Sequence, residues 1–224
     1  AGVPTSYTAS WAGLDTNAQF VGFVIYAVGE GDATFFDINT LHPVVKTKPT
    51  VTGTPKVGST LTGHDAVWDS SGLTVTSQWL SDGEPLGGET THTHVLTNED
   101  LGHKLSFQQT AASGAGQSTT TESLPTAIVK ATSTTAFTFV DATITTSQHA
   151  VLNIVVTSDG TATPSGTVTV KYGTKSSAVV TLDDSGEGTL TLPRLGAATY
   201  TISATYNGDG VTGTSTVSHK LKVS

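Results

Sequence analysis

Two histidines, His92 and His94, come closest in type and spacing to a metal site in this chain. They lie two residues apart in a stretch that we expect to be a strand, so both side chains would project from one face. Two imidazoles on one face can chelate a transition metal. No third ligand follows nearby, although His103 or Glu99 could approach across a hairpin. The alternative, which we favour because short motifs outside their structural context are often accidental, is a pair of solvent-facing side chains on an outer face.

An acidic turn is the second candidate for metal binding. Asp183, Asp184 and Glu187 lie close together in the sequence, and calcium takes six to eight oxygen ligands, many of them carboxylates. Their spacing does not match an EF-hand loop. Asp and Gly are also the residues that tight turns require without any metal, and we favour that interpretation here and for Asn207 and Asp209.

Catalytic motifs are missing from the sequence. Ser, His and Asp all occur, but there is no Gly-x-Ser-x-Gly elbow and no His-Glu-x-x-His pair. The absence of Cys removes thiol nucleophiles and Cys-ligated zinc together. None of the 18 acidic residues is marked by its surroundings as part of a buried catalytic pair. We therefore expect no catalytic residue and no cofactor in this chain, although a larger parent protein could be a hydrolase.

Composition and charge narrow the class of protein further. Only 12% of the 224 residues are charged, Gly occurs 24 times, and no Met is present. A net charge of −8 argues against nucleic acid as a partner, because phosphate binding needs clustered Lys and Arg. No apolar run approaches the ~20 residues that cross a bilayer, so we expect no membrane insertion. Because the chain starts at Ala1 and lacks Met, we expect a processed product or a fragment.

The elements that would carry these side chains are short strands, and they divide the chain into three segments. Residues 1–46 contain an apolar run, Phe20–Val28, and a second expected strand, Ala33–Ile38. So few strands cannot bury a core of their own, and we interpret this segment as the last strands of a truncated sandwich. Residues 47–130 and 131–224 each carry enough alternating strands for a complete immunoglobulin-like (Ig-like) sandwich.

The strands expected in the two longer segments follow from period-two alternation bounded by Gly, Asp and Asn turns. In residues 47–130 they are Thr50–Gly53, Ser59–Ala66, Thr74–Leu80, Thr91–Leu96, Lys104–Ala111 and Ser123–Val129. In residues 131–224 they are Phe137–Ile144, Ala150–Thr157, Thr167–Tyr172, Ala178–Leu182, Gly188–Leu192, Ala198–Tyr206 and Ser215–Val223. The expected fold class is therefore all-β, with tandem Ig-like sandwiches after a partial sandwich segment. The links at 47–49 and 130–133 are short, which favours a semi-rigid rod.

Three stretches of the second segment resemble the Ig-like repeats of exported actinobacterial proteins. They are Thr54–Thr62 (TPKVGSTLT), Gln78–Leu80 with the following Asp-Gly, and Leu96–Leu105 (LTNEDLGHKL). The resemblance implies that Trp79 fills the core from the third strand. It also implies that Asp100 and Gly102 form the corner before the next strand.

The third segment is similar to a bacterial Ig-like domain found in cell-surface and secreted proteins. The similarity rests on Pro164–Val170 (PSGTVTV), Leu182–Leu190 (LDDSGEGTL) and Thr199–Asp209 (TYTISATYNGD). Tyr200 and Tyr206 are its expected structural residues. In the first segment, Ala9–Asp15 and Phe20–Val24 resemble the last strands of the sandwich that follows the protease domain in some secreted subtilisin-like enzymes, and no protease catalytic residue can be placed here.

These resemblances imply a non-catalytic C-terminal appendage of a secreted or cell-wall-associated bacterial protein, and the parent could be a subtilisin-like protease. Such an appendage would act as a spacer, a presenting module or an adhesion module whose first partners are the upstream domains of that protein. The alternative is a carbohydrate-binding module for cell-wall or extracellular polysaccharide, with Trp68 or Trp11 as the exposed aromatic ring. An isopeptide cross-link from Lys104 or Lys171 is a further option that the sequence leaves open.

Overall fold

A computed structural model describes residues 24–28, 32–36, 42–114, 116–173 and 176–224, and all of the regular structure in these ranges is β. The first two strands, β1 (Val24–Val28) and β2 (Asp32–Phe36), form an antiparallel hairpin. β1 falls within the expected run Phe20–Val28, and β2 overlaps the expected strand Ala33–Ile38 but begins one residue before it. The residues that carry the protease-like resemblance lie outside the described ranges, except for Val24, and so does Trp11.

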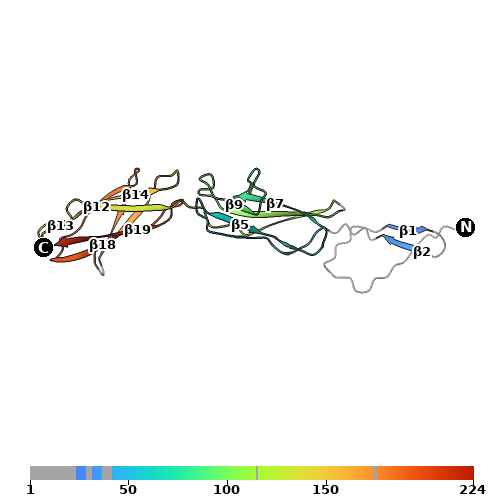
Figure 1. Cartoon of the computed structure of the whole chain (residues 1–224), viewed down its shortest axis with the longest axis horizontal. Helices are drawn as coiled ribbons and strands as arrows, with labels where there is room; N and C mark the ends of the chain where they lie inside the picture. Colours follow the sequence, from blue (N-terminus) through green and yellow to red (C-terminus); the bar gives the residue numbers. More distant parts are fainter. Residues whose placement is uncertain (1–23, 29–31, 37–41, 115, 174–175) are drawn as a thin grey trace.

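The next nine strands form what we call the first sandwich (Figure 1). One sheet has the order β11-β10-β7-β8, a second has the order β4-β5-β9, and β3 pairs with β6. The core cluster holds Leu61, Trp79, Leu96, Leu105, Phe107 and Val129. The strands are β3 (Val45–Thr47), β4 (Thr50–Thr52), β5 (Thr60–His64), β6 (Val67–Trp68), β7 (Thr74–Ser81), β8 (Glu84–Pro85), β9 (Thr93–Val95), β10 (Leu105–Ala112) and β11 (Ser118–Glu122).

The last eight strands form the second sandwich. Its sheets have the orders β12-β14-β17 and β13-β19-β18-β15-β16, and only the short β13 runs parallel to its neighbour. The chain therefore changes sheet between β12 and β13, as the edge of an Ig-like sandwich does. The strands are β12 (Ser133–Phe139), β13 (Thr143–Ile144), β14 (Val151–Ser158), β15 (Thr167–Lys171), β16 (Ser177–Thr181), β17 (Glu187–Thr191), β18 (Ala198–Tyr206) and β19 (Ser215–Val223).

Period-two alternation builds both cores. On β14, Leu152, Ile154 and Val156 are at most 1% exposed, whereas the residues between them are more open. At the start of β18, Tyr200 donates a hydrogen bond from its hydroxyl to the carbonyl oxygen of Gly196, 3.2 Å away. This bond back to the preceding turn is the tyrosine corner of Ig-like folds, and it ties the corner to the strand.

The structure corrects the expected strands at several places. The single strand expected at Phe137–Ile144 is wrong, because β12 ends at Phe139 and Thr143–Ile144 form β13 in the other sheet. The strand expected at Ser123–Val129 is wrong, because the strand of that region, β11, ends at Glu122. Residues 123–129 run as an irregular segment that bonds back to the start of β10 through Thr126 N to Leu105 O and Val129 N to His103 O. Three very short strands, β3, β6 and β8, were not expected.

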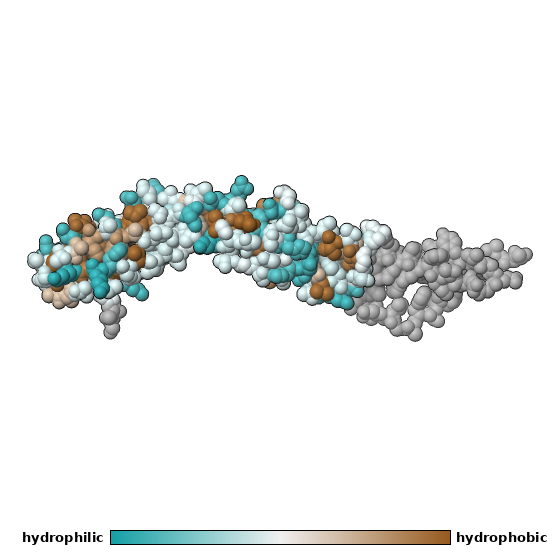
Figure 2. Space-filling view, viewed as in Figure 1, coloured by the Kyte–Doolittle hydropathy of each residue, from teal (hydrophilic) through white to brown (hydrophobic). Residues whose placement is uncertain are grey.

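The two sandwiches follow one another along the long axis of the molecule (Figure 1). Their visible surface is mostly hydrophilic or only weakly apolar, with brown apolar residues in separate small patches (Figure 2). Large exposed hydrophobic residues include Val67 and Val75 in the first sandwich and Val179 in the second. Apolar residues scattered in this way are normal on a folded domain.

Gly63 on β5 gives a direct test of how closely the sheets of the first sandwich pack. A Cβ atom added to Gly63 would lie 2.5 Å from Cγ of Phe107, whereas one added to Gly87 meets nothing within 4 Å. We expect Gly63→Ala to lower the free energy of unfolding by about 1–3 kcal/mol, because the ring must move in a closed core. Gly87→Ala should change it by less than about 0.5 kcal/mol. Urea unfolding followed by tryptophan fluorescence measures both, and equal effects would contradict the close approach.

Candidate functional site

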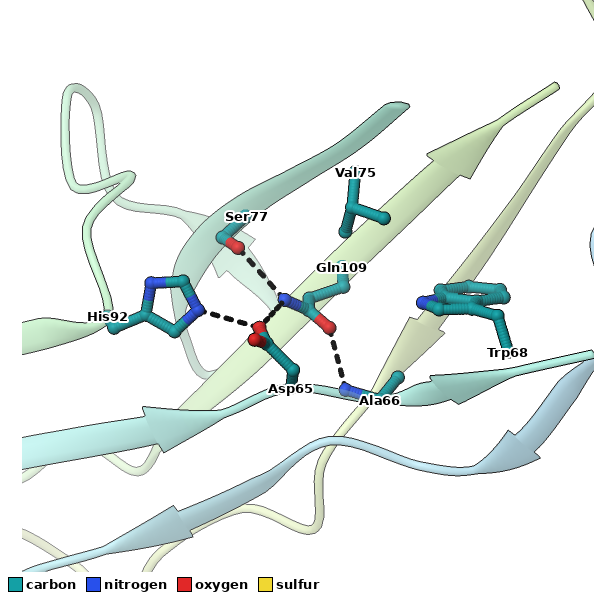
Figure 3. A pocket seen from close by; sticks show the side chains of 7 residues that line it. All are labelled: Asp65, Ala66, Trp68, Val75, Ser77, His92 and Gln109. Carbon is teal, nitrogen blue, oxygen red and sulfur yellow. Dashed lines mark hydrogen bonds and ion pairs between the residues drawn. The ribbon is translucent and has the colours of Figure 1, made fainter. Parts of the chain in front are cut away.

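A pocket of about 320 Å³ lies in the first sandwich, where β6, β7 and β10 meet the loops that precede β6 and β9 (Figure 3). Its polar lining comes from Asp65, Ser77, His92 and Gln109. Its apolar lining comes from Ala66, Trp68 and Val75. The pocket is therefore polar on one side and aromatic or aliphatic on the other.

Gln109 is the centre of the polar side, and only 1% of it is exposed. Its Oε1 accepts a hydrogen bond from the backbone N–H of Ala66 at 2.8 Å. Its Nε2 donates to Oγ of Ser77 at 3.1 Å and also to Oδ1 of Asp65. Because both ends of the amide are bonded, the side chain is held in one orientation (Figure 3).

Asp65 carries the charge of the pocket. Its Oδ1 lies 2.6 Å from Nε2 of His92, and about two thirds of its side chain is exposed. The hydrogen bond from His92 lowers the pKa of the Asp65 carboxyl, and the bond from Gln109 lowers it further against the opposing effect of burial. The carboxylate is therefore ionised at neutral pH and is held by two donors.

Trp68 closes the pocket from β6. Its indole nitrogen Nε1 is buried, and no hydrogen-bond partner for it occurs among the described residues. In Figure 3 the edge of the ring that carries this nitrogen faces the side of Gln109. A buried N–H donor without an acceptor costs about 1–3 kcal/mol, so this donor favours an acceptor that enters the pocket.

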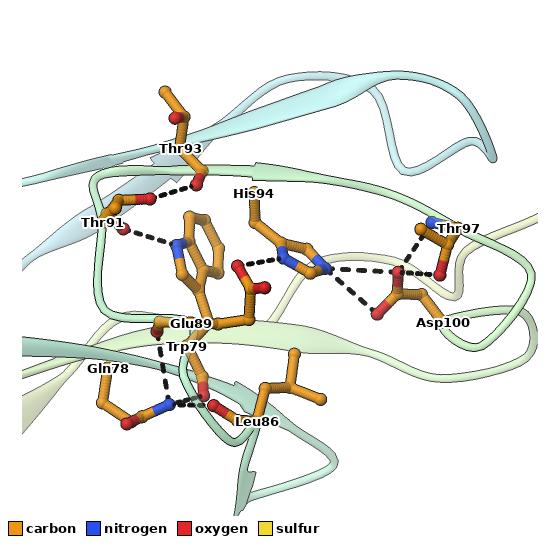
Figure 4. Close-up of polar contacts among 9 residues, drawn as sticks. All are labelled: Gln78, Trp79, Leu86, Glu89, Thr91, Thr93, His94, Thr97 and Asp100. Atoms are coloured by element: carbon orange, nitrogen blue, oxygen red, sulfur yellow. Dashed lines mark hydrogen bonds and ion pairs between the residues drawn. The ribbon is translucent and has the colours of Figure 1, made fainter.

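The two candidate metal ligands His92 and His94 belong to separate networks. His94 is only 8% exposed, and the interpretation of it as a solvent-facing side chain is wrong. Its Nδ1 lies 3.1 Å from Oε2 of Glu89, and its Nε2 lies 3.2 Å from both carboxylate oxygens of Asp100 (Figure 4). Within the described ranges, no group of three or more His, Cys, Asp or Glu residues could hold a metal ion.

The other expected ligands are used in local hydrogen bonds. Nδ1 of His103 lies 2.8 Å from Oδ2 of Asp82. The backbone N–H of Glu99 bonds to Oγ1 of Thr97. In the acidic turn, Oδ1 of Asp183 accepts the N–H groups of Ser185 and Glu187, both at 2.9 Å. This bonding explains Asp183 as a turn residue; the carboxylate oxygens of Asp184 and Glu187 accept no hydrogen bond in the part of the chain described.

The expected structural residues of the first sandwich are Trp79, Asp100 and Gly102. Trp79 is fully buried and donates from Nε1 to the carbonyl oxygen of Thr91 at 2.9 Å. Asp100, which is 3% exposed, accepts the backbone N–H of Thr97 at 2.8 Å and so closes the corner before β10 (Figure 4). Gly102 takes a φ of +87°, which favours glycine.

In the second sandwich, the fully buried Tyr206 and the half-buried Asp209 form a comparable network. The hydroxyl of Tyr206 donates to the carbonyl oxygen of Ser165 at 2.8 Å and lies 3.0 Å from Oδ2 of Asp209. Burial, together with the bond to Asp209, raises the pKa of Tyr206 to about 12. Burial by itself would raise the pKa of Asp209, but N–H donation from Ser165, Val211 and Thr212 outweighs it and lowers that pKa to about 2.

Three polar residues of the pocket were not expected from the sequence: Asp65, Ser77 and Gln109. A signal for two of them was present. On β10 the inward positions are Leu105, Phe107, Gln109 and Ala111, so Gln109 interrupts an apolar face. Ser77 is the direct cross-strand partner of Gln109. Two polar residues that face inward on neighbouring strands mark a polar opening in a core.

The fold and the site together define a pair of Ig-like β-sandwiches, one of which carries a small polar pocket. Residues 137–224 match the family described as bacterial Ig-like domain (group 3). No curated protein matches the chain. Among the described residues, no helix has the length and apolar character needed to cross a membrane.

Several solved structures match the chain at low similarity. The fibronectin(III)-like modules of Clostridium thermocellum CbhA are 12% identical, with a TM-score of 0.35, and the match covers 78% of this chain and 94% of that one. Murine CEACAM1b is 13% identical, with a TM-score of 0.39, and the match covers 79% and 100%. A chimeric titin Z1Z2 carrying a KLER peptide from decorin is 19% identical, with a TM-score of 0.27 and coverage of 81% and 96%.

The lowered pKa of Asp209 makes the second sandwich acid-sensitive. A carboxyl with a depressed pKa stabilises the folded state above its unfolded pKa, and this contribution is lost as the pH falls toward the folded value. We expect the free energy of unfolding of the second sandwich to fall between pH ~4 and pH ~2, and Asp209→Asn to remove part of that fall. Urea titrations at each pH, followed by the methyl NMR signals of Ile154 and Ile202, measure the change.

Asp184→Asn is the matched control, because no hydrogen bond of the Asp184 side chain occurs in the described structure and this exposed residue lies in the same sandwich. Its acid dependence should follow that of the unmodified protein. An identical acid dependence in Asp209→Asn and the unmodified chain would show that the Asp209 carboxylate does not stabilise the folded state.

Proposed function

We propose that this chain is a non-catalytic appendage of a secreted or cell-wall-associated bacterial protein, and that it holds neighbouring domains at a fixed separation and orientation. The bacterial Ig-like match supports the bacterial and extracellular setting of this proposal. The observation that carries the spacing role is the joint between the two sandwiches, where no free linker residue separates them.

Adjacent residues at the joint are bonded to different sandwiches. The N–H of Lys130 donates to Pro55 O, and its carbonyl oxygen accepts the N–H of Val57, so Lys130 is held by the first sandwich. The next residue, Ala131, donates to Val211 O and accepts from the N–H of Gly213, so it is held by the second. A change of interdomain angle must therefore break backbone hydrogen bonds rather than rotate an unbonded peptide.

Side chains across the joint add to this restraint. Nζ of Lys130 donates to the carbonyl oxygen of Asp209 at 2.7 Å. A Cβ atom added to Gly102 would lie 3.2 Å from Cγ1 of Val211, and one added to Gly160 would lie 3.3 Å from Cδ2 of Leu101. The corner of the first sandwich that contains Gly102 therefore packs directly on the loops of the second.

The corner residues acquire a second role in this proposal. Asp100 shapes the turn that presents Leu101 and Gly102, and Asp209 shapes the loop that presents Val211. Each carboxylate therefore supports the surface that its sandwich offers to the other. The parent protein in this proposal can be a subtilisin-like protease or an adhesive protein, since both need a spacer between domains.

Spin labels on the two sandwiches test the rigidity. Because the chain has no native Cys, Lys104→Cys in the first sandwich and Lys171→Cys on β15 give one label at each chosen place. Both positions are exposed. We expect double electron–electron resonance to give one narrow distance distribution, since the joint has no unbonded residue.

The matched control inserts Gly-Ser-Gly-Ser between Lys130 and Ala131, which adds a flexible segment without changing either sandwich. Its distance distribution should be clearly broader. If the unmodified joint gives a distribution as broad as the insertion variant, the chain is a flexible tether and the spacing role proposed here is wrong.

A further inference from the structure

We propose that the pocket of the first sandwich binds one sugar unit of a neutral extracellular polysaccharide. This inference goes beyond the spacing role and does not depend on it, because it concerns a side-chain cluster away from the joint. It rests on three features of the pocket: its fixed polar groups, its apolar wall and its charge.

The polar groups are arranged before any ligand enters. Gln109 is fixed at both ends of its amide, and Asp65 is held by His92 and Gln109. Both bonds use Oδ1 of Asp65, and Oδ2 accepts no hydrogen bond within the described structure. Oδ2 can therefore accept from a ligand hydroxyl, while the side chain loses little freedom on binding.

The unpartnered indole N–H of Trp68 supplies the complementary donor. A ligand that satisfies it must bring an acceptor, and one that bonds Oδ2 of Asp65 must bring a donor. A hydroxyl group acts as both, and a sugar carries several at fixed spacing. The Trp68 ring must move slightly on binding, because its Nε1 is buried and a ligand cannot otherwise reach it.

The opposite wall suits the apolar face of a sugar ring. Trp68 offers an aromatic surface, and Val75, which is 42% exposed, continues the apolar lining. Tryptophan combines a large apolar ring with a polar N–H group, so it suits a partner that has one apolar and one polar side. The volume of about 320 Å³ lies at the lower end of small-ligand pockets, which fits one or two sugar units and weak binding.

The charge of the site selects against acidic ligands. Asp65 lines the pocket, whereas neither Lys nor Arg does. The whole chain has a net charge of −8. A phosphate, a uronic acid or an anionic wall polymer would meet a carboxylate without a cation to balance it, so a neutral glycan is the ligand class that fits.

The test is an NMR titration of the full chain with neutral tetrasaccharides of β-1,4-linked glucose, xylose, mannose and N-acetylglucosamine. The signals to follow are the indole N–H of Trp68 and the side-chain amide of Gln109. Concentrations up to roughly 10 mM approach saturation for a millimolar dissociation constant. We expect at least one sugar to shift both signals saturably, while the indole signal of Trp79, already bonded to Thr91, stays in place.

Two variants place the binding in the pocket. Asp65→Ala should weaken the affinity about tenfold, because it removes a charged acceptor. Trp68→Phe keeps an aromatic ring but removes the donor, and it should also weaken binding. The matched control, Asp184→Ala in the second sandwich, should bind as the unmodified chain does. The Trp79 indole signal confirms that the first sandwich, which holds the pocket, is folded in each variant.

Saturable shifts of the Gln109 amide signal that are lost in Asp65→Ala or in Trp68→Phe support the proposal. If none of the four sugars shifts the two signals, or if glycerol shifts them equally at the same concentration, the pocket is not a sugar site. Binding that survives both substitutions would also overturn it, because the sugar would then sit elsewhere.

Discussion

A strand in a two-sheet sandwich turns only every second side chain toward the space between the sheets, and the rest of this structure depends on that constraint. On β10 the buried face consists of Leu105, Phe107, Gln109 and Ala111. Apolar members of such a face close the core, and Gly63 on the opposite sheet leaves room for the Phe107 ring. A polar side chain on this face needs hydrogen-bond partners within the protein, and Gln109 bonds to Asp65 and Ser77. The pocket exists where the apolar alternation is interrupted.

The second consequence of strand pairing is the joint. One residue of the connecting segment is held by backbone hydrogen bonds to the first sandwich, and the next residue is held in the same way by the second. No unbonded peptide therefore lies between the sandwiches about which they could rotate. The two residues are Lys130 and Ala131. The corner of Asp100 and the loop of Asp209 then meet across the joint, so two turn carboxylates support both the folds and their contact. Backbone hydrogen bonds on both sides of the joint, and the side-chain contacts beside them, connect the two sandwiches.

Long alternating strands were predictable, and short or irregular segments were not. The expected bounds of Ala198–Tyr206 and Ser215–Val223 coincide with β18 and β19, because nine residues of alternation leave no other register. β6 and β8 have two residues each, too few to show a period. Residues 123–129 were expected to form a strand but do not, although Val129 is fully buried. Burial marks an inward side chain, and it does not by itself require a sheet ladder.

The sequence by itself determined the all-β class, the inward faces of the long strands and the turns that separate them, because all of these depend on residues near one another in the chain. It also marked Trp68 as an aromatic residue without a certain place in a core. Only the tertiary structure decided that Gln109 meets Asp65, 44 positions away, that His94 turns inward to Asp100, and that Lys130 and Ala131 belong to different sandwiches. These contacts join residues from different segments, and the alternation within each segment does not show which segments will meet. Only the tertiary packing brings them together.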